Sequence, residues 1–296
     1  RPVNGAQILT ALAGALRGGQ IQVIDLTQTL TPEFPQIALP PEFGQCWPFR
    51  IEEVSKYDER GPGWYWNNFS CGEHTGTHFD APIHWISGRD LPNNSVDTIP
   101  VGHFVAPAVV RNLKPALLAA HPVLAASAAI RDVKSGGGFN IEALEISPDQ
   151  QRLLIGFRSP LQGNRAIIAS VENLAAIFDA DAPPLVSATL STLDLGGNGI
   201  RGMSYIAALG GYLIISGPAS RESAHFDLWF WNGQSDTSAR RVTVPGLHGF
   251  ERAEGVSPAL IDGKQQIIIV SDDGRRKDRR YARFLLLEPA QLQIAP

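Results

Sequence analysis

The sequence contains few cysteines: only Cys46 and Cys71 occur among its 296 residues. Two cysteines are too few for the disulfide framework that stabilises small secreted domains. They can form one bridge, but two free thiols in a reducing compartment fit the sequence at least as well. We therefore favour a cytoplasmic location. A periplasmic one stays open, because the chain starts at Arg1 rather than at methionine and a signal peptide could have been removed.

The sequence also lacks long hydrophobic runs and an excess of positive charge. No stretch approaches the ~18 consecutive apolar residues that a membrane-spanning helix needs. The net charge is -4 and the pI is near 6.0, whereas nucleic-acid-binding domains usually carry a basic patch. The basic run at 275–280 is interrupted by Asp278 and follows two aspartates, so we interpret it as a solvated hairpin loop. We expect neither a membrane partner nor a nucleic-acid partner.

Hydrophobic residues make up 44% of the sequence, which is enough for one large domain or two modest ones. Near the start, apolar residues spaced three and four apart predict a helix over residues 6–17, ended by a pair of glycines. Strands are predicted at 23–27 and 64–70. Six prolines between residues 32 and 62 predict an extended or irregular segment there.

Residues 74–84 hold three of the seven histidines, His74, His78 and His84, together with Asp80. Two imidazoles and one carboxylate suit zinc, manganese or iron(II), and they leave coordination positions open for water and substrate. In an extended segment His78 and Asp80 share a face, and Gly76 lets the backbone turn so that His74 converges on them. Gly76, two threonines and Pro82 oppose a helix. The segment therefore predicts a loop or strand that binds a divalent metal through His74, His78 and Asp80.

His84 lies beyond Pro82 and suits acid/base chemistry better than metal ligation. A bound metal can lower the pKa of its water from 15.7 to ~7. A histidine, with an ordinary pKa of ~6.5, could take that proton and return it to a leaving nitrogen. We therefore expect His84 to be the catalytic base of a hydrolase in which metal-bound hydroxide attacks the substrate.

The pattern His74-x-Gly76-Thr77-His78-x-Asp80-x-Pro82-x-His84 resembles the signature of the cyclase family of metal-dependent hydrolases. This family includes bacterial kynurenine formamidase and isatin hydrolase. The resemblance covers about residues 23–110, and the aromatic segment 63–69 with residues 71–73 is most similar to the isatin hydrolase branch.

The resemblance implies the N-terminal part of a swivelling β/β/α domain that is usually dimeric. It implies one or two manganese or zinc ions bound by His74, His78 and Asp80, with His84 as base. The implied substrate is a cyclic or aryl amide, either an isatin-like lactam or an N-formylkynurenine-like formamide. Trp64 and Trp66 are candidates for the wall of the substrate pocket, although ordinary core packing explains them equally well. Phe34 and Phe43 are weaker candidates.

The second half of the sequence repeats. Each of three apolar strand-like segments is preceded, about a dozen residues earlier, by another short segment and is followed, some fifteen residues later, by another strand. The three apolar segments are 153–160, 212–218 and 267–274. Repeats of short strands separated by Gly, Pro and Asp are typical of propeller blades, and closed propellers use at least ~4. Either a blade is hidden in residues 111–140 or the propeller is incomplete. Residues 115–129, rich in alanine and leucine, predict a short helix.

This half resembles an uncharacterised bacterial family of propeller-like proteins over about residues 115–292. The predicted fold class is mixed: a partial metal-hydrolase domain at 1–110, then an all-β, propeller-like repeat domain of about three blades at 111–296. Glu142 and Glu254 occupy equivalent repeat positions. They could bind a cation or ligand in a central channel, but we favour structural glutamates.

Two alternatives to the hydrolase stay open. The chain could be a non-catalytic propeller-type binding protein with a vestigial metal site. It could also be inactive, because it joins the front of one family to the back of another and both domains are incomplete.

Overall fold

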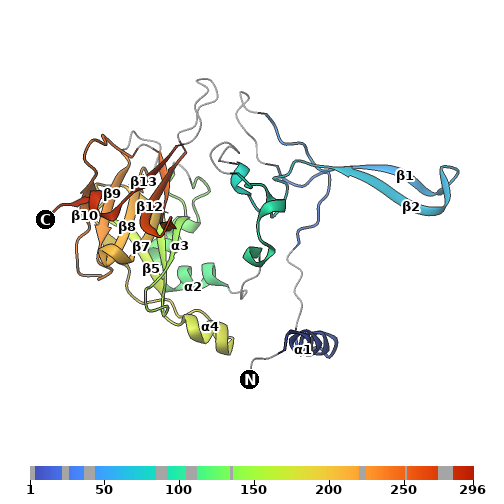
Figure 1. The fold of residues 1–296 in the computed structure, drawn as a ribbon, viewed down its shortest axis with the longest axis horizontal. Helices are drawn as coiled ribbons and strands as arrows, with labels where there is room; N and C mark the ends of the chain where they lie inside the picture. Colours follow the sequence, from blue (N-terminus) through green and yellow to red (C-terminus); the bar gives the residue numbers. More distant parts are fainter. Residues whose placement is uncertain are drawn as a thin grey trace. The chain divides into compact units, whose positions relative to one another are not determined.

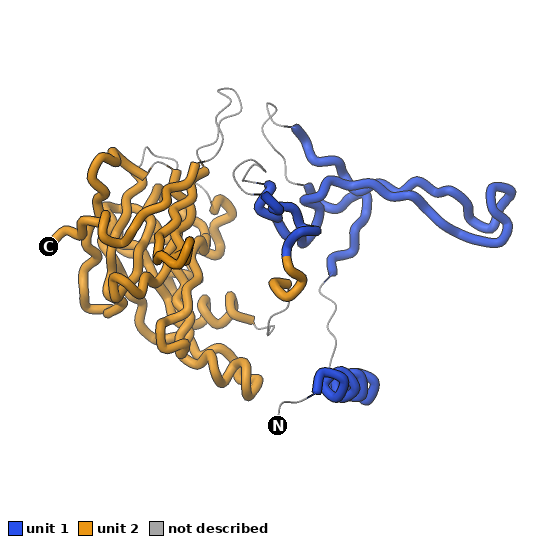
Figure 2. Tube along the Cα trace, in the orientation of Figure 1, with its two compact units in different colours: residues 1–99 blue, residues 100–296 orange. Residues whose placement is uncertain are grey.

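A computed structural model of the 296-residue chain describes residues 4–21, 27–36, 44–84, 92–104, 112–133, 136–219, 225–250, 252–272 and 283–296. The chain divides into two compact units, residues 1–99 and residues 100–296 (Figure 2). Most of the predicted strand at 23–27, the predicted domain boundary near residue 110, Phe43 and the basic run at 275–280 lie outside the described residues. Among the described helices, none is both long enough and apolar enough to cross a membrane.

The described residues of unit 1 form an α-helix, a β-hairpin and two short 3₁₀ helices (Figure 1). Helix α1 spans Gly5–Arg17, begins at Asn4, whose side chain accepts a hydrogen bond from the Ala6 N–H, and ends at Gly18, as the sequence predicts. Strands β1 (Arg50–Asp58) and β2 (Gly61–Ser70) form an antiparallel pair. The strand predicted at 64–70 is confirmed, whereas β1 lies in the segment predicted to be extended or irregular.

Unit 2 is built from three antiparallel sheets, in each of which consecutive strands are neighbours. All nine strands expected from the repeat are present. The first sheet has β3 (Asn140–Ile146), β4 (Leu153–Ser159), β5 (Ala166–Val171) and β6 (Ser191–Leu193). The second has β7 (Gly199–Ile206), β8 (Gly211–Gly217), β9 (Asp227–Trp231) and β10 (Arg240–Thr243), and β14 (Gln293–Ile294) pairs with β10. The third has β11 (Ala253–Ile261), β12 (Lys264–Ser271) and β13 (Phe284–Leu287).

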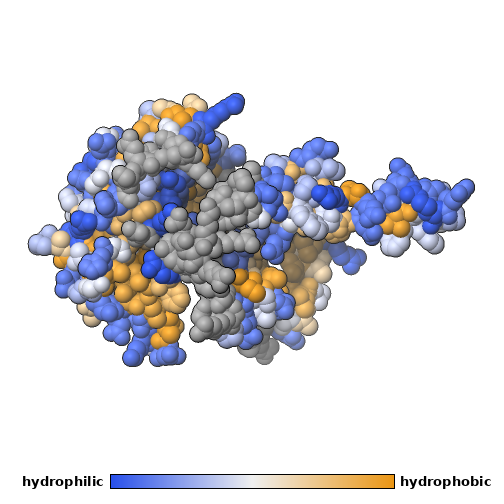
Figure 3. All heavy atoms as spheres, turned by 90° about the horizontal axis from the view of Figure 1, so that it is seen from above, coloured by the Kyte–Doolittle hydropathy of each residue, from blue (hydrophilic) through white to orange (hydrophobic). Residues whose placement is uncertain are grey.

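The sheets of unit 2 pack in layers because alternate side chains of a strand point to opposite faces. In β8, Ile214 packs in the cluster shared with the first sheet, whereas Leu213 and Ile215 pack in the cluster shared with the third. In β4, Leu154 joins the cluster with the second sheet, and Ile155 faces the helices. Each central strand is therefore apolar on both faces. Hydrophobic side chains still reach the surface in both units (Figure 3).

Helices cover the outer face of the first sheet. Helices α2 (Leu113–Ala120) and α3 (Pro122–Ala128) contribute Leu117 and Leu124 to the cluster with Ile155, and α4 (Leu174–Ala180) contributes Ile177. The short helix predicted at 115–129 is confirmed as two helices that meet at His121, because proline favours the first position of a new helix. The alternative that a blade is hidden in residues 111–140 is wrong for the described residues, since α2 and α3 occupy most of 113–128 and no strand lies in 112–133 or 136–139. The propeller-like arrangement of about three blades and the swivelling domain stay predictions.

The first strand of each sheet carries a charged residue at the same place. The pairing of β3 with β4, β7 with β8 and β11 with β12 skips Glu142, Arg201 and Glu254, respectively, as a β-bulge does. Arg201, only 8% exposed, contacts Glu142 at 3.0 Å and also pairs with Glu254. Arg158 contacts Glu142 at 3.2 Å and donates to the Pro218 carbonyl at 3.0 Å. We call Glu142, Arg158, Arg201 and Glu254 the inter-sheet ion-pair cluster; these contacts favour structural roles for both glutamates.

Two short 3₁₀ helices follow β2 in unit 1, and one lies at the start of unit 2. They are η1 (Pro82–His84), η2 (Val96–Thr98) and η3 (Val101–Phe104). The predicted metal motif lies in the loop between β2 and η1.

Candidate metal centre

The loop from Cys71 to Ala81 has no helical residue, as the sequence predicts. Its start is held by the Gly72 N–H, which donates to the Trp47 carbonyl at 3.0 Å, and by the Thr75 N–H, which donates to the Gly72 carbonyl at 3.1 Å. Gly76 has a φ of +73°, and a Cβ there would lie 3.2 Å from Leu30 Cδ2. Glycine adopts this left-handed conformation without the steric cost that a side chain brings. The turn at Gly76 therefore sets the path that returns the chain towards His74.

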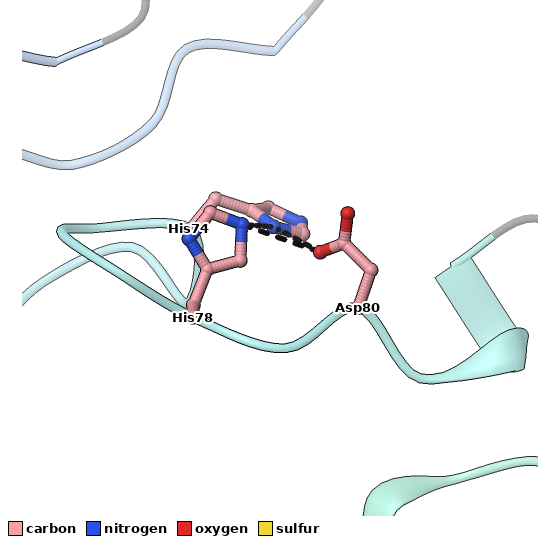
Figure 4. A group of neighbouring side chains, drawn as sticks. All are labelled: His74, His78 and Asp80. Carbon is pink, nitrogen blue, oxygen red and sulfur yellow. Dashed lines mark hydrogen bonds and ion pairs between the residues drawn. The ribbon is translucent and has the colours of Figure 1, made fainter. Parts of the chain in front are cut away.

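His74, His78 and Asp80 converge through one ligand atom each (Figure 4). His74 Nδ1 lies 2.9 Å from His78 Nε2 and 3.0 Å from Asp80 Oδ1, and His78 Nε2 lies 3.3 Å from the same oxygen. Two ligand atoms that bind one metal ion at right angles, each ~2.1 Å from the ion, are ~3.0 Å apart. The triangle formed by His74 Nδ1, His78 Nε2 and Asp80 Oδ1, which we call the ligand triangle, therefore has the size of one face of a metal coordination shell. The three residues fit a divalent ion.

The outer atoms of both imidazoles also have partners. His78 Nδ1 lies 2.9 Å from the Gly76 carbonyl oxygen. Because a carbonyl only accepts, Nδ1 carries the proton and Nε2 presents its lone pair to the ligand triangle. His74 Nε2 lies 3.7 Å from the carboxylate of Glu73. Such outer partners orient the histidines of metal sites, and Gly76 thus contributes both its conformation and its carbonyl.

His84 lies beside the ligands without being one of the three. It ends η1, where its N–H donates to the Ala81 carbonyl at 2.9 Å. Its ring centroid is 4.3 Å from that of His74, with the ring planes inclined by 60°. The His84 side chain is exposed. The loop and η1 therefore bring all four predicted residues of the motif together.

Trp64 and Trp66 lie within β2 and not in the loop. They are 56% and 54% exposed, so ordinary core packing does not explain them. Along a strand, the six and four residues that separate them from Ser70 span ~20 and ~13 Å. Among the described residues no hydrogen bond or ring contact joins either tryptophan to the histidines, and their place in a substrate pocket stays a prediction. Phe34, the weaker candidate, lies closer: its Cζ would be 3.9 Å from a Cβ on Gly76.

The two cysteines are free thiols. A Cβ on Gly72 would overlap Cys46 Sγ at 2.0 Å, so the Cys46 thiol packs directly against the loop backbone ahead of the motif. Sequence reasoning also did not assign Glu73 or Leu30 to the site. Glu73 directly precedes the first ligand, but only the folded loop shows that its carboxylate faces His74 Nε2 and that Leu30 borders Gly76.

Comparison with known proteins finds matches to a different family in each part of the chain. Residues 111–286, more than half of the chain, match the family described as "Protein of unknown function (DUF3616)". The chain belongs to this family. Residues 24–146 match a second family, described as "Putative cyclase". Both resemblances inferred from the sequence are confirmed, and the two matches overlap at residues 111–146.

The cyclase-family segment is similar to isatin hydrolases. The chain is 43% identical over 106 residues to isatin hydrolase of Roseibium aggregatum, covering 36% of this chain and 40% of that protein. Isatin hydrolase A of Ralstonia solanacearum is 60% identical over 40% of this chain and 44% of its own, with a TM-score of 0.36. Isatin hydrolase A of Labrenzia aggregata bound to benzyl benzoate is 46% identical over 48% of this chain and 47% of its own, with a TM-score of 0.35. The chain thus spans less than half the length of these relatives.

Proposed function

We propose that the chain is a metal-dependent hydrolase of a carbon–nitrogen bond in a cyclic or aryl amide. We favour an isatin-like lactam as the substrate over an N-formylkynurenine-like formamide. The observation that carries this proposal is the convergence of His74 Nδ1, His78 Nε2 and Asp80 Oδ1 within 3.3 Å of one another. The 43% identity to an isatin hydrolase over 106 residues supports the choice of the lactam.

His74, His78 and Asp80 would hold one manganese or zinc ion, and a second ion would need ligands beyond these three. A bound divalent ion supplies Lewis acidity, which polarises a carbonyl and makes water more acidic. The carboxylate of Asp80 neutralises part of the ion's charge, and the carbonyl of Gly76 keeps the His78 ring in the orientation that presents Nε2.

His84 moves the proton in this proposal. In hydrolysis of a lactam, water adds to the carbonyl carbon, the carbon–nitrogen bond breaks, and the products are a carboxylate, an amine and one released proton. The nitrogen leaves only when it gains a proton, and the proton comes from the attacking water. His84, exposed and 4.3 Å from the His74 ring by centroid distance, can accept that proton and pass it to the nitrogen.

The test is turnover and metal content of the full chain with manganese or zinc supplied. Isatin and N-formylkynurenine are the substrates, and conversion is followed by mass spectrometry. Asp80→Ala should lose both the ion and turnover, and His84→Ala should retain the ion while the rate falls by ~10²–10⁴. Asp97→Ala, an exposed carboxylate on η2, is the matched control and should leave both unchanged. A chain without bound metal under these conditions would refute the proposal.

A second candidate is a binding protein with a vestigial metal site. The observation that favours it is the openness of the site: the side chains of His74, His78 and Asp80 are 27%, 32% and 37% exposed. Stoichiometric metal binding without turnover of either substrate would select this candidate, and a chain that binds no metal and turns over neither substrate would be the inactive one. The homodimer and the cytoplasmic location are also part of our proposal. Light scattering measures the assembly, and cell fractionation measures the location.

A further inference from the structure

Unit 2 contains a cavity that no part of the metal-site chemistry uses. It has a volume of about 700 Å³ and lies between the junction of α2 with α3 and the first sheet. Residues on three segments line it: the helix junction, the turn before β5 and the segment that leads into β6. Among them are His121, Val123, Gln162, Arg165, Leu190 and Thr192.

Arg165 gives this cavity its positive charge. Its Nε donates to Thr192 Oγ1 at 3.2 Å and its Nη2 donates to the Thr192 carbonyl at 2.9 Å. One edge of the guanidinium is therefore held by β6, whereas Nη1 has no hydrogen-bond partner among the described residues. No Asp or Glu lines the cavity, and Arg165 makes no ion pair within the described part of the chain. A guanidinium fixed on one edge is ready to bind a carboxylate on the other.

His121 also lines the cavity, at the junction of the two helices. The residue is only 4% exposed, and its backbone joins the two helices: its N–H donates to the Leu117 carbonyl, and its carbonyl accepts from the Leu124 N–H. The Nε2 atom of its ring is buried and has no hydrogen-bond partner in the part of the chain that the structure describes. Because this atom is closed off from solvent, it is not part of the surface that the cavity presents, and Arg165 is the charged group that a bound molecule would meet.

The rest of the lining is apolar or neutral. Pro122, Val123 and Leu190 contribute hydrocarbon surface, and Gln162 contributes an amide. A single fixed cation with apolar neighbours suits a monoanion attached to an apolar body. A phosphate dianion would leave one of its charges without a cationic partner here.

We propose that this cavity binds a small organic carboxylate, with the carboxylate on Arg165 and the apolar body against Val123 and Leu190. The site shares no residue with His74, His78 and Asp80, so this proposal does not depend on the proposed hydrolase activity.

Calorimetry on the full-length wild-type chain tests the proposal with phenylacetate, phenylacetamide and inorganic phosphate. Phenylacetate should bind saturably at one site per chain. The amide lacks the charge and phosphate lacks the apolar body, so each should bind at least about tenfold more weakly, the loss expected for one charge-assisted hydrogen-bonded pair. Equal binding of the amide, equal binding of phosphate, or no saturable binding of phenylacetate would each overturn the proposal.

Variants then locate the site. Arg165→Gln should weaken phenylacetate binding by at least about tenfold, whereas Arg152→Gln, directly before β4 and outside the lining, should not change it. Undiminished binding by a folded Arg165→Gln chain would contradict the assignment. Circular dichroism establishes folding. If Arg165→Gln does not fold, the comparison of the carboxylate with the amide on the wild-type chain still decides the result.

Discussion

Replacing Arg201 by alanine tests whether the inter-sheet ion-pair cluster holds the three sheets of unit 2 together. Arg201 is the only residue of the cluster that contacts glutamates from both outer sheets, Glu142 on β3 and Glu254 on β11. Its side chain is 9% exposed. After Arg201→Ala, Glu142 would keep Arg158 at 3.2 Å, whereas Glu254 would have no cationic partner among the described residues.

The expected loss follows from the burial of the stranded carboxylate. Removing one partner of a buried ion pair costs ~3–5 kcal/mol of unfolding free energy, because the other charge stays out of water. The Glu254 side chain is 33% exposed, so water relieves part of this cost and we expect the lower end, about 3 kcal/mol. Arg60→Ala is the matched control, because Arg60 pairs with Glu53 and Asp58 and all three side chains are at least 38% exposed. Such surface pairs contribute little to the unfolding free energy.

Urea unfolding of the full chain, followed by far-UV circular dichroism, measures both variants. Hydrogen exchange of the amides in β3, β7 and β11 assigns the change to the three sheets. Adding Glu254→Gln to Arg201→Ala should recover part of the loss, since the stranded charge is then gone. The reasoning is refuted if Arg201→Ala loses no more stability than Arg60→Ala, or if the second substitution recovers nothing.

Three further changes probe the site, the cluster and the core. Gly76→Ala places a side chain at φ +73° and 3.2 Å from Leu30, so metal affinity measured by chelator competition should fall by ~10-fold. Gly63→Ala is the control and should not change the affinity, because a Cβ there meets nothing within 4 Å. Equal affinities of the two variants would show that the turn does not position the ligands. Burial raises the pKa of Glu254 above its ordinary 4.5 despite the opposing effect of Arg201, so the stability that this carboxyl contributes is fully present below pH 4.5 and is lost as the pH rises through the raised value. The unfolding free energy of wild type relative to Glu254→Gln should therefore fall as the pH rises from 4.5 towards neutrality, and a flat difference in a urea titration would contradict this. Leu213→Ala, at a fully buried position between the second and third sheets, should cost ~2–5 kcal/mol in the same assay, and a loss below ~1 kcal/mol would show that the two sheets do not share a packed core.

The strands of unit 2 were predictable because their pattern is strong over a short range. The central strands β4 and β8 are apolar on both faces, so their sequences stand out from the Gly-rich and Pro-rich turns around them. Strand β1 carries Glu52, Glu53, Lys56 and Asp58 and is mostly exposed, so neither alternation nor hydrophobicity marks it. Its pairing with β2 alone makes it a strand.

The ion pairs of Arg201 show what a single sequence does not reveal. Glu142 and Glu254 were recognised as equivalent repeat positions, but Arg201, at the same position of the middle repeat, carries the opposite charge and breaks the similarity. It lies 59 residues from Glu142 and 53 from Glu254, and only the packing of three sheets brings the side chains together. Charge reversal within a repeat is itself a signal: like charges at equivalent positions of neighbouring sheets would repel, whereas alternating charges attract.

The candidate metal centre, unlike the ion pairs of Arg201, was predictable because its ligands lie within seven residues of one another in the sequence and a single turn brings them together. Because the ligands are local, metal binding and catalytic turnover depend on different parts of the structure. The ligand triangle needs only the turn at Gly76, the hydrogen bond from His78 Nδ1 to the Gly76 carbonyl and the neighbouring Leu30, all of which lie in unit 1. Catalysis needs more, since a hydrolytic site gains rate from walls that orient the substrate and displace bulk water, and here all three ligands and His84 are accessible to solvent. Metal binding is therefore the property that this chain should retain most robustly. Turnover tests whether further residues enclose the site. Metal binding and turnover therefore answer separate questions, and both must be measured to assign the function.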